Sequence, residues 1–355
     1  MFMIIVGLGK IGGLYKDRLK FLLPKTNVYT IDPYKKEADF SDVETAIYFF
    51  EKNSMKNCIW IISAPTPVHC TIIETIISSQ SGSKILVEKP FCHNKNIDKI
   101  SLLIRKCEEK NTRIVVNDIY KNSLMVKNIA EYIKDEKIYS ITIEMSKNRN
   151  KDISEGRFVD NEIGIVGYEW FHLLSLADII LGKKRNDYKK TKTKIRMSSN
   201  EKAVGVYETW NNDESDLSLI SNLDGFIQYL PPNWVLNHLN KNIKRNIKST
   251  GNIPYGSQFK YRIINIKTNK ARYFALFEFK FDEIKIDCKK DYKNSHLLLR
   301  KDESGIVARC FNENHFDTSL LRNIDKLKDY NGSILQFKNI VNNAAYFPII
   351  PLENI

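Results

Sequence analysis

The first 120 residues alternate between short runs rich in valine and isoleucine and longer segments whose apolar residues have helical spacing. The short runs predict strands at 3–8, 27–32, 58–64, 84–90 and 113–118. The longer segments predict helices at 12–23, 43–52, 68–80 and 96–110. Buried apolar strands joined by helical crossovers form a parallel sheet that is covered on both faces. The alternation therefore predicts a doubly wound α/β fold, whose ligand binds at the carboxyl ends of the strands.

A glycine-rich loop, GLGKIGG, joins the first strand to the first helix. Gly7 allows the tight turn out of the strand, and Gly12 allows the helix to pack close to the sheet. Gly9 lets the backbone approach a pyrophosphate because no Cβ stands in the way. Lys10 and Ile11 open the helix, whose free N–H groups and positive dipole attract phosphates. These positions predict a nicotinamide dinucleotide site, and the alternative is a structural turn.

Asp32 ends the second strand. A carboxylate at this position accepts hydrogen bonds from both ribose hydroxyls of the adenosine and repels a 2′-phosphate. The sequence therefore favours NAD over NADP. Lys35 and Lys36 follow closely and could weaken that preference.

The chain of 355 residues suits two domains, which we place at 1–120 and 121–355. Its six cysteines form no CxxC pair and no His-spaced cluster, so we expect reduced thiols and no metal. No apolar run has the length of a membrane helix, and the N-terminus lacks the pattern of a signal peptide. These features predict a cytoplasmic protein.

The net charge of +13 raises the question of nucleic-acid binding. Lysines gather at 182–194 and 240–248, and such runs can bind phosphates non-specifically. No nucleic-acid motif accompanies them. We therefore interpret both runs as solvated faces and expect neither nucleic acid nor membrane as a partner.

Two further stretches lie at predicted strand ends: SAPTPVH (63–69) follows the third strand and EKP (88–90) ends the fourth. With the glycine loop and Asp32, this order resembles the glucose–fructose oxidoreductase/inositol dehydrogenase (Gfo/Idh/MocA) family. The resemblance is specific over the first 120 residues. It implies an N-terminal Rossmann domain and a C-terminal α+β domain with a large, mostly antiparallel sheet. It also places the nicotinamide against Ala64, Pro65, Thr66, His69, Glu88 and Lys89.

Lys89 is the first catalytic candidate. Hydride leaves the carbinol carbon while a proton leaves the neighbouring oxygen, and an ammonium beside that oxygen stabilises its developing negative charge. A partly dry, cationic site lowers the pKa of a lysine, so that it can relay the proton. Glu88 would pair with Lys89 or position cofactor groups. The alternative is an ordinary surface pair before a turn proline, whereas the resemblance implies a cis Lys89–Pro90 bond.

The segment 167–182 has helical spacing and holds the second candidate, His172. The family places a histidine ten residues before such a closing glycine, but the usual companion aspartates are replaced here by Tyr168 and Ser175. Glu169, three residues before the histidine, shares its helix face and could substitute. Tyr168 could instead act on the substrate or serve as an acid, and a structural histidine is the alternative for His172.

Asn117, at the last Rossmann strand, matches a position where the family often has a polar contact to substrate or cofactor. Beyond it, alternation predicts strands of a half-buried antiparallel sheet at 137–146, 203–210, 258–267 and 271–281. The stretch with Pro231 and Pro232 is a loop near the substrate or only a connection. Apolar side chains on both faces of 271–281, such as Phe274, predict an interface and hence a homodimer or homotetramer.

These observations together predict an NAD-dependent oxidoreductase acting on a sugar, a cyclitol or a nucleotide-linked sugar, with Lys89 and His172 handling the proton. Two alternatives stay open. One is an imine- or enone-reducing biosynthetic enzyme on the same scaffold. The other is a regulator that holds the cofactor without turnover.

Overall fold

The computed structural model describes residues 2–55, 57–92, 96–149, 169–197, 203–237, 254–255, 258–278 and 294–329. The chain forms two compact units. Unit 1 contains the residues up to Ile119 and the segment that begins at Phe316, and unit 2 contains Tyr120–His315. The chain therefore returns to its first unit near its C-terminus, which none of the sequence patterns predicted.

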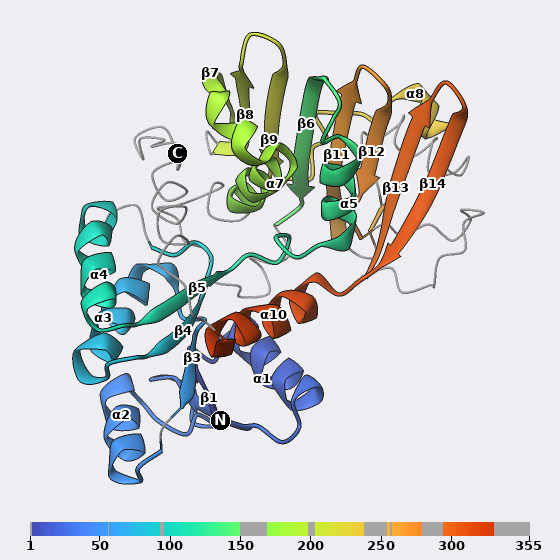
Figure 1. Ribbon diagram of the computed structural model, residues 1–355. Helices are drawn as coiled ribbons and strands as arrows, with labels where there is room; N and C mark the ends of the chain where they lie inside the picture. The colour runs from blue at the N-terminus through green and yellow to red at the C-terminus, as the bar shows by residue number, and fades with distance from the viewer. Residues whose placement is uncertain are drawn as a thin grey trace. The chain divides into compact units, whose positions relative to one another are not determined.

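Unit 1 is built on a five-stranded parallel sheet with the strand order β2-β1-β3-β4-β5 (Figure 1). Its strands are β1 (Phe2–Val6), β2 (Asn27–Ile31), β3 (Cys58–Ile62), β4 (Lys84–Glu88) and β5 (Arg113–Asn117). Its helices are α1 (Lys10–Leu22), the short η1 (Thr66–Val68), α2 (Val43–Lys52), α3 (His69–Ser79), α4 (Ile97–Glu109) and α10 (His315–Asp329). This confirms the predicted doubly wound sheet, whose order reverses between β1 and β3.

Helices cover both faces of this sheet (Figure 1). On one face, α2, α3 and α4 pack apolar side chains such as Phe50, Ile73 and Leu103 against the strands. On the other face, α1 and α10 do the same with Leu19 and Leu320. Because both faces are covered, the interior strand β1 is entirely buried and β3 is buried at all but one residue, which explains their apolar sequences.

Unit 2 is built on a nine-stranded sheet with the order β14-β13-β12-β11-β6-β9-β8-β7, in which β10 pairs with β11. Its strands are β6 (Ile138–Lys147), β7 (Lys189–Met197), β8 (Ala203–Asn211), β9 (Asp216–Asn222), β10 (Pro254–Tyr255), β11 (Gln258–Thr268), β12 (Arg272–Leu276), β13 (Ser295–Asp302) and β14 (Gly305–Asn312). Of these pairings only β6–β9 is parallel, which confirms the mostly antiparallel sheet.

Three helices and a 3-10 segment accompany this sheet: α5 (Leu124–Tyr132), α7 (Phe171–Leu181), η4 (Gly182–Asp187) and α8 (Asn233–Leu236). Helices α5 and α7 lie on the same face (Figure 1). Helix α8 starts after Pro232 and buries Trp234 and Leu236 against a cluster that includes Tyr261 and Phe274. The proline stretch is thus an ordered connection that covers the sheet.

The aromatic strand differs from its prediction. It ends as β12 at Leu276, and residues 279–281 lie outside the described parts of the chain. Tyr273, Phe274 and Leu276 are all at most 3% exposed within the single chain. Both faces of β12 are therefore covered, so the expected homodimer or homotetramer loses the exposed apolar face that motivated it and would need another surface.

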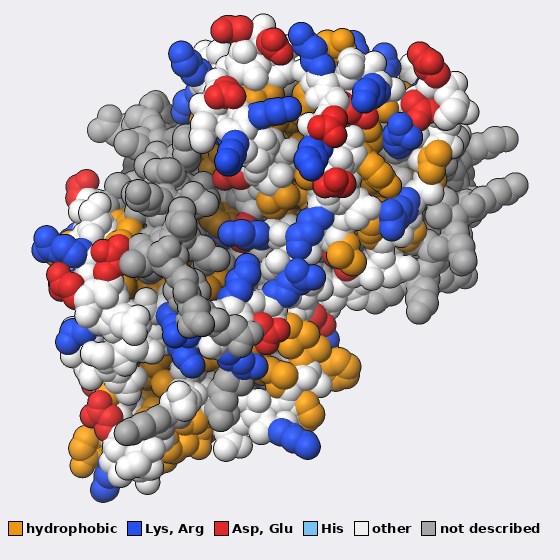
Figure 2. Space-filling model, viewed as in Figure 1, with side chains coloured by type: hydrophobic (Ala, Val, Ile, Leu, Met, Phe, Trp, Pro, Cys, Tyr) orange, Lys and Arg blue, Asp and Glu red, His pale blue; other side chains and the backbone are white. Residues whose placement is uncertain are grey.

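The basic run at 182–194 forms η4 and most of β7, an edge strand whose residues are nearly all exposed. Over the sheet of unit 2, Lys and Arg side chains alternate with Asp and Glu (Figure 2). The second run, at 240–248, lies outside the described residues. Within the described ranges, no helix combines the length and apolar character needed to cross a bilayer.

The cysteines follow the expectation only in part. Cys58, Cys70, Cys92 and Cys107 are free, and all but Cys58 are buried. Cys310, however, is disulfide-bonded. The expectation of reduced thiols throughout is therefore wrong for Cys310.

Candidate functional site

The glycine loop between β1 and α1 has the backbone geometry that its sequence predicts. Gly7 has a φ of +93°, and a Cβ there would lie 2.6 Å from the backbone of Ala64. A Cβ on Gly12 would lie 1.9 Å from the carbonyl oxygen of Gly7. Both positions therefore require glycine for reasons internal to the protein.

Gly9 differs from both, because a Cβ added to it would meet no atom within 4 Å. Its φ of −75° is ordinary for any residue. Gly9 is the N-cap of α1, which has no side-chain cap and no acidic residue in its first turn. The first N–H groups of an α-helix, here including those of Lys10 and Ile11, have no partner within the helix. This arrangement fits a bound pyrophosphate.

Asp32 lies directly after β2 and reaches back to the glycine loop. Its Oδ2 accepts the N–H of Leu8 at 2.7 Å, and its Oδ1 accepts the N–H of Tyr34 at 2.9 Å. Each carboxylate oxygen has a second lone pair, so Asp32 can still accept ribose hydroxyls. Lys35 and Lys36 are exposed beside it.

The loop after β3 packs against the glycine loop, and contacts of the His69 ring hold the loop after β3 in place. Ser63 donates to the carbonyl oxygen of Gly7 at 2.8 Å. His69 is 1% exposed; its Nε2 lies 2.8 Å from the Ala64 oxygen, and its Nδ1 lies 3.1 Å from the Pro90 oxygen. Burial lowers the pKa of His69, whereas the carbonyl oxygens around its ring act in the opposite direction. His69 thus ties together the loops after β3 and β4, while Pro65 and Thr66 are more exposed.

Glu88 and Asn117 end adjacent strands and share a buried hydrogen-bond cluster. Glu88 Oε1 accepts the hydroxyl of Tyr15 at 2.6 Å and the amide of Asn117 at 2.7 Å. The Asn117 oxygen accepts the hydroxyl of Ser319 at 2.9 Å and the amide of Asn323 at 3.3 Å. Burial raises the pKa of Glu88, whereas the two donors and the charge of Lys89 act in the opposite direction.

This cluster bears on two expected contacts. Asn117 is 2% exposed, and its amide already bonds with protein groups on both sides. Its expected contact with a substrate stays a prediction, and the structure adds a second role in holding Glu88. Lys89 follows β4 directly, is half-buried, and has the expected cis bond to Pro90.

In unit 2, the helix expected around His172 is α7, which ends at Gly182 as predicted. His172 is 5% exposed, and its ring meets that of Tyr120 edge-on, with centroids 5.0 Å apart. Tyr120 is fully buried and accepts a hydrogen bond from Arg262 at 2.9 Å. Tyr168 lies outside the described residues, so its expected role stays untested.

Glu169, the expected substitute partner of His172, lies in a buried ionic cluster. It is 1% exposed, and both of its oxygens accept hydrogen bonds from Arg262 Nη2 at 2.9 Å. Arg149 pairs with the same carboxylate. Arg262 also reaches Glu278 at 3.4 Å. Two guanidinium groups thus hold Glu169 as an anion at the start of α7, and its expected contact with substrate stays a prediction.

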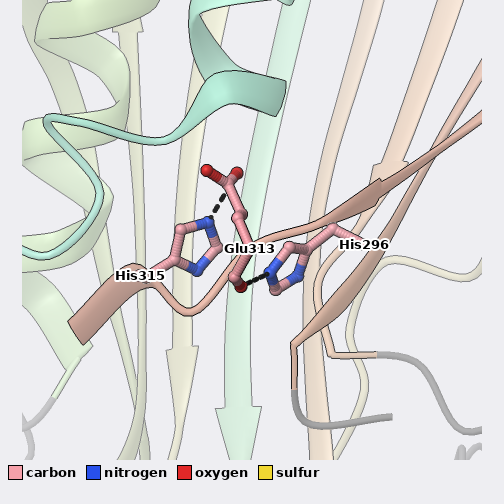
Figure 3. A group of neighbouring side chains, drawn as sticks. All are labelled: His296, Glu313 and His315. Carbon is pink, nitrogen blue, oxygen red and sulfur yellow. Dashed lines mark hydrogen bonds and ion pairs between the residues drawn. The ribbon is translucent and has the colours of Figure 1, made fainter. Parts of the chain in front are cut away.

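A third group of side chains has residue types that bind metals: His296, Glu313 and His315 (Figure 3). Their ligand atoms lie within 4.8 Å of one another. His296 Nδ1 accepts the N–H of Glu278 at 3.0 Å, so its Nε2 carries the proton and donates to the Glu313 carbonyl at 3.1 Å. The two histidine rings stack with centroids 4.1 Å apart.

The Glu313 carboxylate also has hydrogen-bond and ion-pair partners. It accepts the hydroxyl of Ser123 at 2.7 Å and the N–H of Leu124 at 2.8 Å, and it pairs with His315 at 3.0 Å. Burial would raise the pKa of Glu313, but the hydrogen bond and charge of His315 lower it to about 2. Both nitrogens of His296, both carboxylate oxygens of Glu313 and Nε2 of His315 thus have hydrogen-bond partners. We interpret the group as a buried cap for α5.

The main residues that the sequence analysis missed are partners of those it found. Tyr15, Ser319 and Asn323 bind the Glu88–Asn117 pair, while Tyr120 meets His172 and Arg262 bonds with Tyr120. Each comes from a segment distant in sequence, so no local spacing could have indicated it. A buried polar residue at a strand end, such as Asn117, is the available signal that partners exist.

Comparison with known proteins shows which solved structures have a similar fold. No family profile and no curated protein sequence matches the chain. Among solved structures, the 3-ketoreductase KijD10 from Actinomadura kijaniata, in complex with NADP and TDP-benzene, matches with a TM-score of 0.65 at 10% identity, over 97% of this chain and 94% of that one. A dehydrogenase, MviM, from Clostridium difficile matches with a TM-score of 0.61 at 11% identity, over 98% and 97%. The chain thus has the two-part fold of these oxidoreductases.

Proposed function

We propose that this protein is a nicotinamide-dinucleotide-dependent oxidoreductase that acts on a carbinol or keto carbon of a sugar, a cyclitol or a nucleotide-linked sugar. The observation that carries the proposal is the open space beside Gly9 at the uncapped N-terminus of α1, between two glycines that the fold itself requires. The whole-length likeness to a 3-ketoreductase bound to NADP supports it.

The dinucleotide, when bound, supplies or accepts the hydride. Gly7, Gly9 and the N–H groups of Lys10 and Ile11 would hold its pyrophosphate, and Asp32 its adenosine ribose. His69 keeps the loop at Ala64–Thr66 against the glycine loop. The remaining chemistry, which is the movement of a proton, falls to side chains of this chain.

Lys89 is the residue that we assign to the substrate oxygen. Its ammonium would stabilise negative charge on that oxygen during hydride transfer, and its amine would take the proton during oxidation. Glu88 places a carboxylate next to it in the chain, held by Tyr15 and Asn117. His172, buried on α7, is assigned a second place in proton transfer. Tyr168 and Glu169 remain candidate contacts to the substrate.

The proposal is tested first by binding. A Gly9→Val side chain enters the space expected for the pyrophosphate, and its Cβ would meet no atom of the folded protein within 4 Å. We therefore expect calorimetry to show dinucleotide affinity lowered at least roughly 10-fold, with unchanged thermal unfolding. Gly13→Val, also without neighbours within 4 Å, is the matched control. Equal affinity of wild type and Gly9→Val would contradict the proposal.

The same titration tests cofactor choice. Asp32 leads us to expect tighter binding of NAD(H) than of NADP(H). Tighter binding of NADP(H) would overturn the expected preference for NAD(H) and would assign the 2′-phosphate to Lys35 and Lys36. It would leave the proposed dinucleotide site unchanged.

Catalysis is tested at Lys89. We expect Lys89→Ala to bind dinucleotide almost as wild type does but to lower turnover roughly 100-fold or more, as for other positioned acid–base groups. The assay screens sugars, cyclitols and nucleotide-linked sugars by nicotinamide absorbance. Lys52→Ala, which removes an exposed cation from the last turn of α2, is the control. Full turnover by Lys89→Ala would remove the lysine from the mechanism.

A further inference from the structure

Two cysteines of unit 1 lie together. Cys70 is the second residue of α3, and Cys92 follows the EKP segment at the end of β4. Both are free, both belong to the same buried cluster, and they are 6% and 1% exposed. The Cys92 thiol donates a hydrogen bond to the sulfur of Cys70. Neither is used by the function proposed above.

The backbones that carry the two thiols are also fixed to each other. His69, the neighbour of Cys70, bonds through Nδ1 with the carbonyl oxygens of Pro90 at 3.1 Å and Phe91 at 3.2 Å. Phe91 is the neighbour of Cys92. These buried contacts hold the segment that carries Cys92 against the start of α3, which carries Cys70.

The two thiols differ in reactivity. The hydrogen bond from Cys92 lowers the pKa of Cys70, although burial and the charge of Glu74 act in the opposite direction. Cys70 also lies in the first turn of α3, where the helix dipole favours a thiolate. The same hydrogen bond raises the pKa of Cys92. Burial raises the pKa of Cys58 to about 11 and that of Cys107 to about 12.

We propose that Cys70 and Cys92 form a reversible disulfide when the protein meets hydrogen peroxide, with Cys70 as the attacking thiolate and Cys92 as the resolving thiol. This modification site does not depend on the proposed oxidoreductase activity. Cys70 is the more exposed of the two, so a small peroxide reaches it first.

The reaction has two steps. The Cys70 thiolate attacks one peroxide oxygen, so that an S–O bond forms, the O–O bond breaks and hydroxide leaves with the electron pair. The sulfur of Cys92 then attacks the sulfenic sulfur of Cys70, an S–S bond forms, the S–O bond breaks, and the thiol proton leaves with the oxygen as water. The two thiols lose two electrons and the peroxide becomes two waters. A dithiol reductant reverses the bond by exchange.

The bond would have a local consequence. Cys92 lies three residues after Lys89 in the chain. A covalent link to α3 would therefore fix the segment that follows β4 and carries the lysine.

The test is peptide mapping of the full chain. The reduced protein is exposed to hydrogen peroxide, quenched, alkylated in denaturant and analysed by mass spectrometry with and without dithiothreitol. We expect a linked Cys70–Cys92 peptide that dithiothreitol removes. We also expect Cys70 to lose alkylation at least roughly 10-fold faster than Cys58, which is more exposed but less acidic.

Two variants assign the roles. Cys92→Ser should abolish the link and accumulate a Cys70 sulfenic acid that dimedone traps, whereas Cys70→Ser should leave Cys92 fully alkylated. Cys107→Ser is the control that should keep the link. If either variant fails to fold, the wild-type time course alone decides. Loss of Cys58 before Cys70, or oxidation of Cys70 to sulfinic acid with no link to Cys92, would overturn the proposal.

Discussion

In unit 1 the carboxylate of Glu88 is held by a hydroxyl and an amide, whereas in unit 2 that of Glu169 is held by two guanidinium groups. The first arrangement uses neutral donors. The second places charges of both signs where water is excluded. Removing one neutral donor leaves a weaker hydrogen-bond cluster, but removing one charge leaves its buried partners of opposite charge with less compensation. The two units should therefore respond very differently to single substitutions.

The largest effect is expected at Glu169. Glu169→Gln keeps the shape but leaves Arg149 and Arg262 without their shared carboxylate. We expect the free energy of unfolding to fall by about 3–5 kcal/mol, measured by urea denaturation. Glu74→Gln, which breaks the half-exposed pair with Lys106, should cost at most about 1 kcal/mol. Similar small losses in both variants would mean that the buried cluster adds little to stability.

The comparison also shows what a sequence can predict. The loop at Gly7 and Gly12 is local, because strand, turn and helix follow one another, and its geometry can be inferred from the order of its residues. The partners of Glu169 could not be inferred in this way, since Arg262 lies 93 residues away in sequence. Likewise, the spacing of Leu320, Ile324 and Leu327 is that of an amphipathic helix, but it does not specify which sheet the helix covers.

Glu144 sharpens the comparison, because it is a buried carboxylate of unit 2 that is held by neutral donors. It accepts the N–H groups of Gln228 at 2.9 Å and Tyr229 at 2.7 Å. Burial raises its pKa from an ordinary 4.5 to about 7. The folded state then binds the proton more tightly than the unfolded state does, so this contribution to stability is complete below the lower value and is lost as the pH rises to the higher one.

We therefore expect wild-type stability to fall between pH 4.5 and about 7 by up to about 3 kcal/mol from this group. The glutamine in Glu144→Gln does not titrate, so the stability of this variant should fall less steeply with rising pH over the same range. Urea denaturation across the range measures both proteins. Parallel slopes would show that Glu144 ionises normally in the folded protein.

The smallest effect is expected at Tyr15 in unit 1. Tyr15→Phe removes one donor from Glu88 and one acceptor from Asn117, and Asn117 still bonds with Glu88. We expect a loss of about 1–2 kcal/mol in thermal or urea unfolding. Tyr48→Phe, at an exposed position, should change stability by less than about 0.5 kcal/mol. A loss as large as that of Glu169→Gln would erase the difference between the units.

Helix α10 belongs to unit 1 but is synthesised after most of unit 2. The face of the sheet that includes Met3, Ile5 and Leu86 packs with Leu320 and Ile324 of this helix. On the ribosome, β1 to β5 emerge first, and all of Tyr120–His315 must be synthesised before α10 follows. Until then, an apolar face of the nascent sheet stays partly uncovered. The sheet of unit 1 is therefore made first, but one of its faces is fully covered only after Tyr120–His315 has been synthesised.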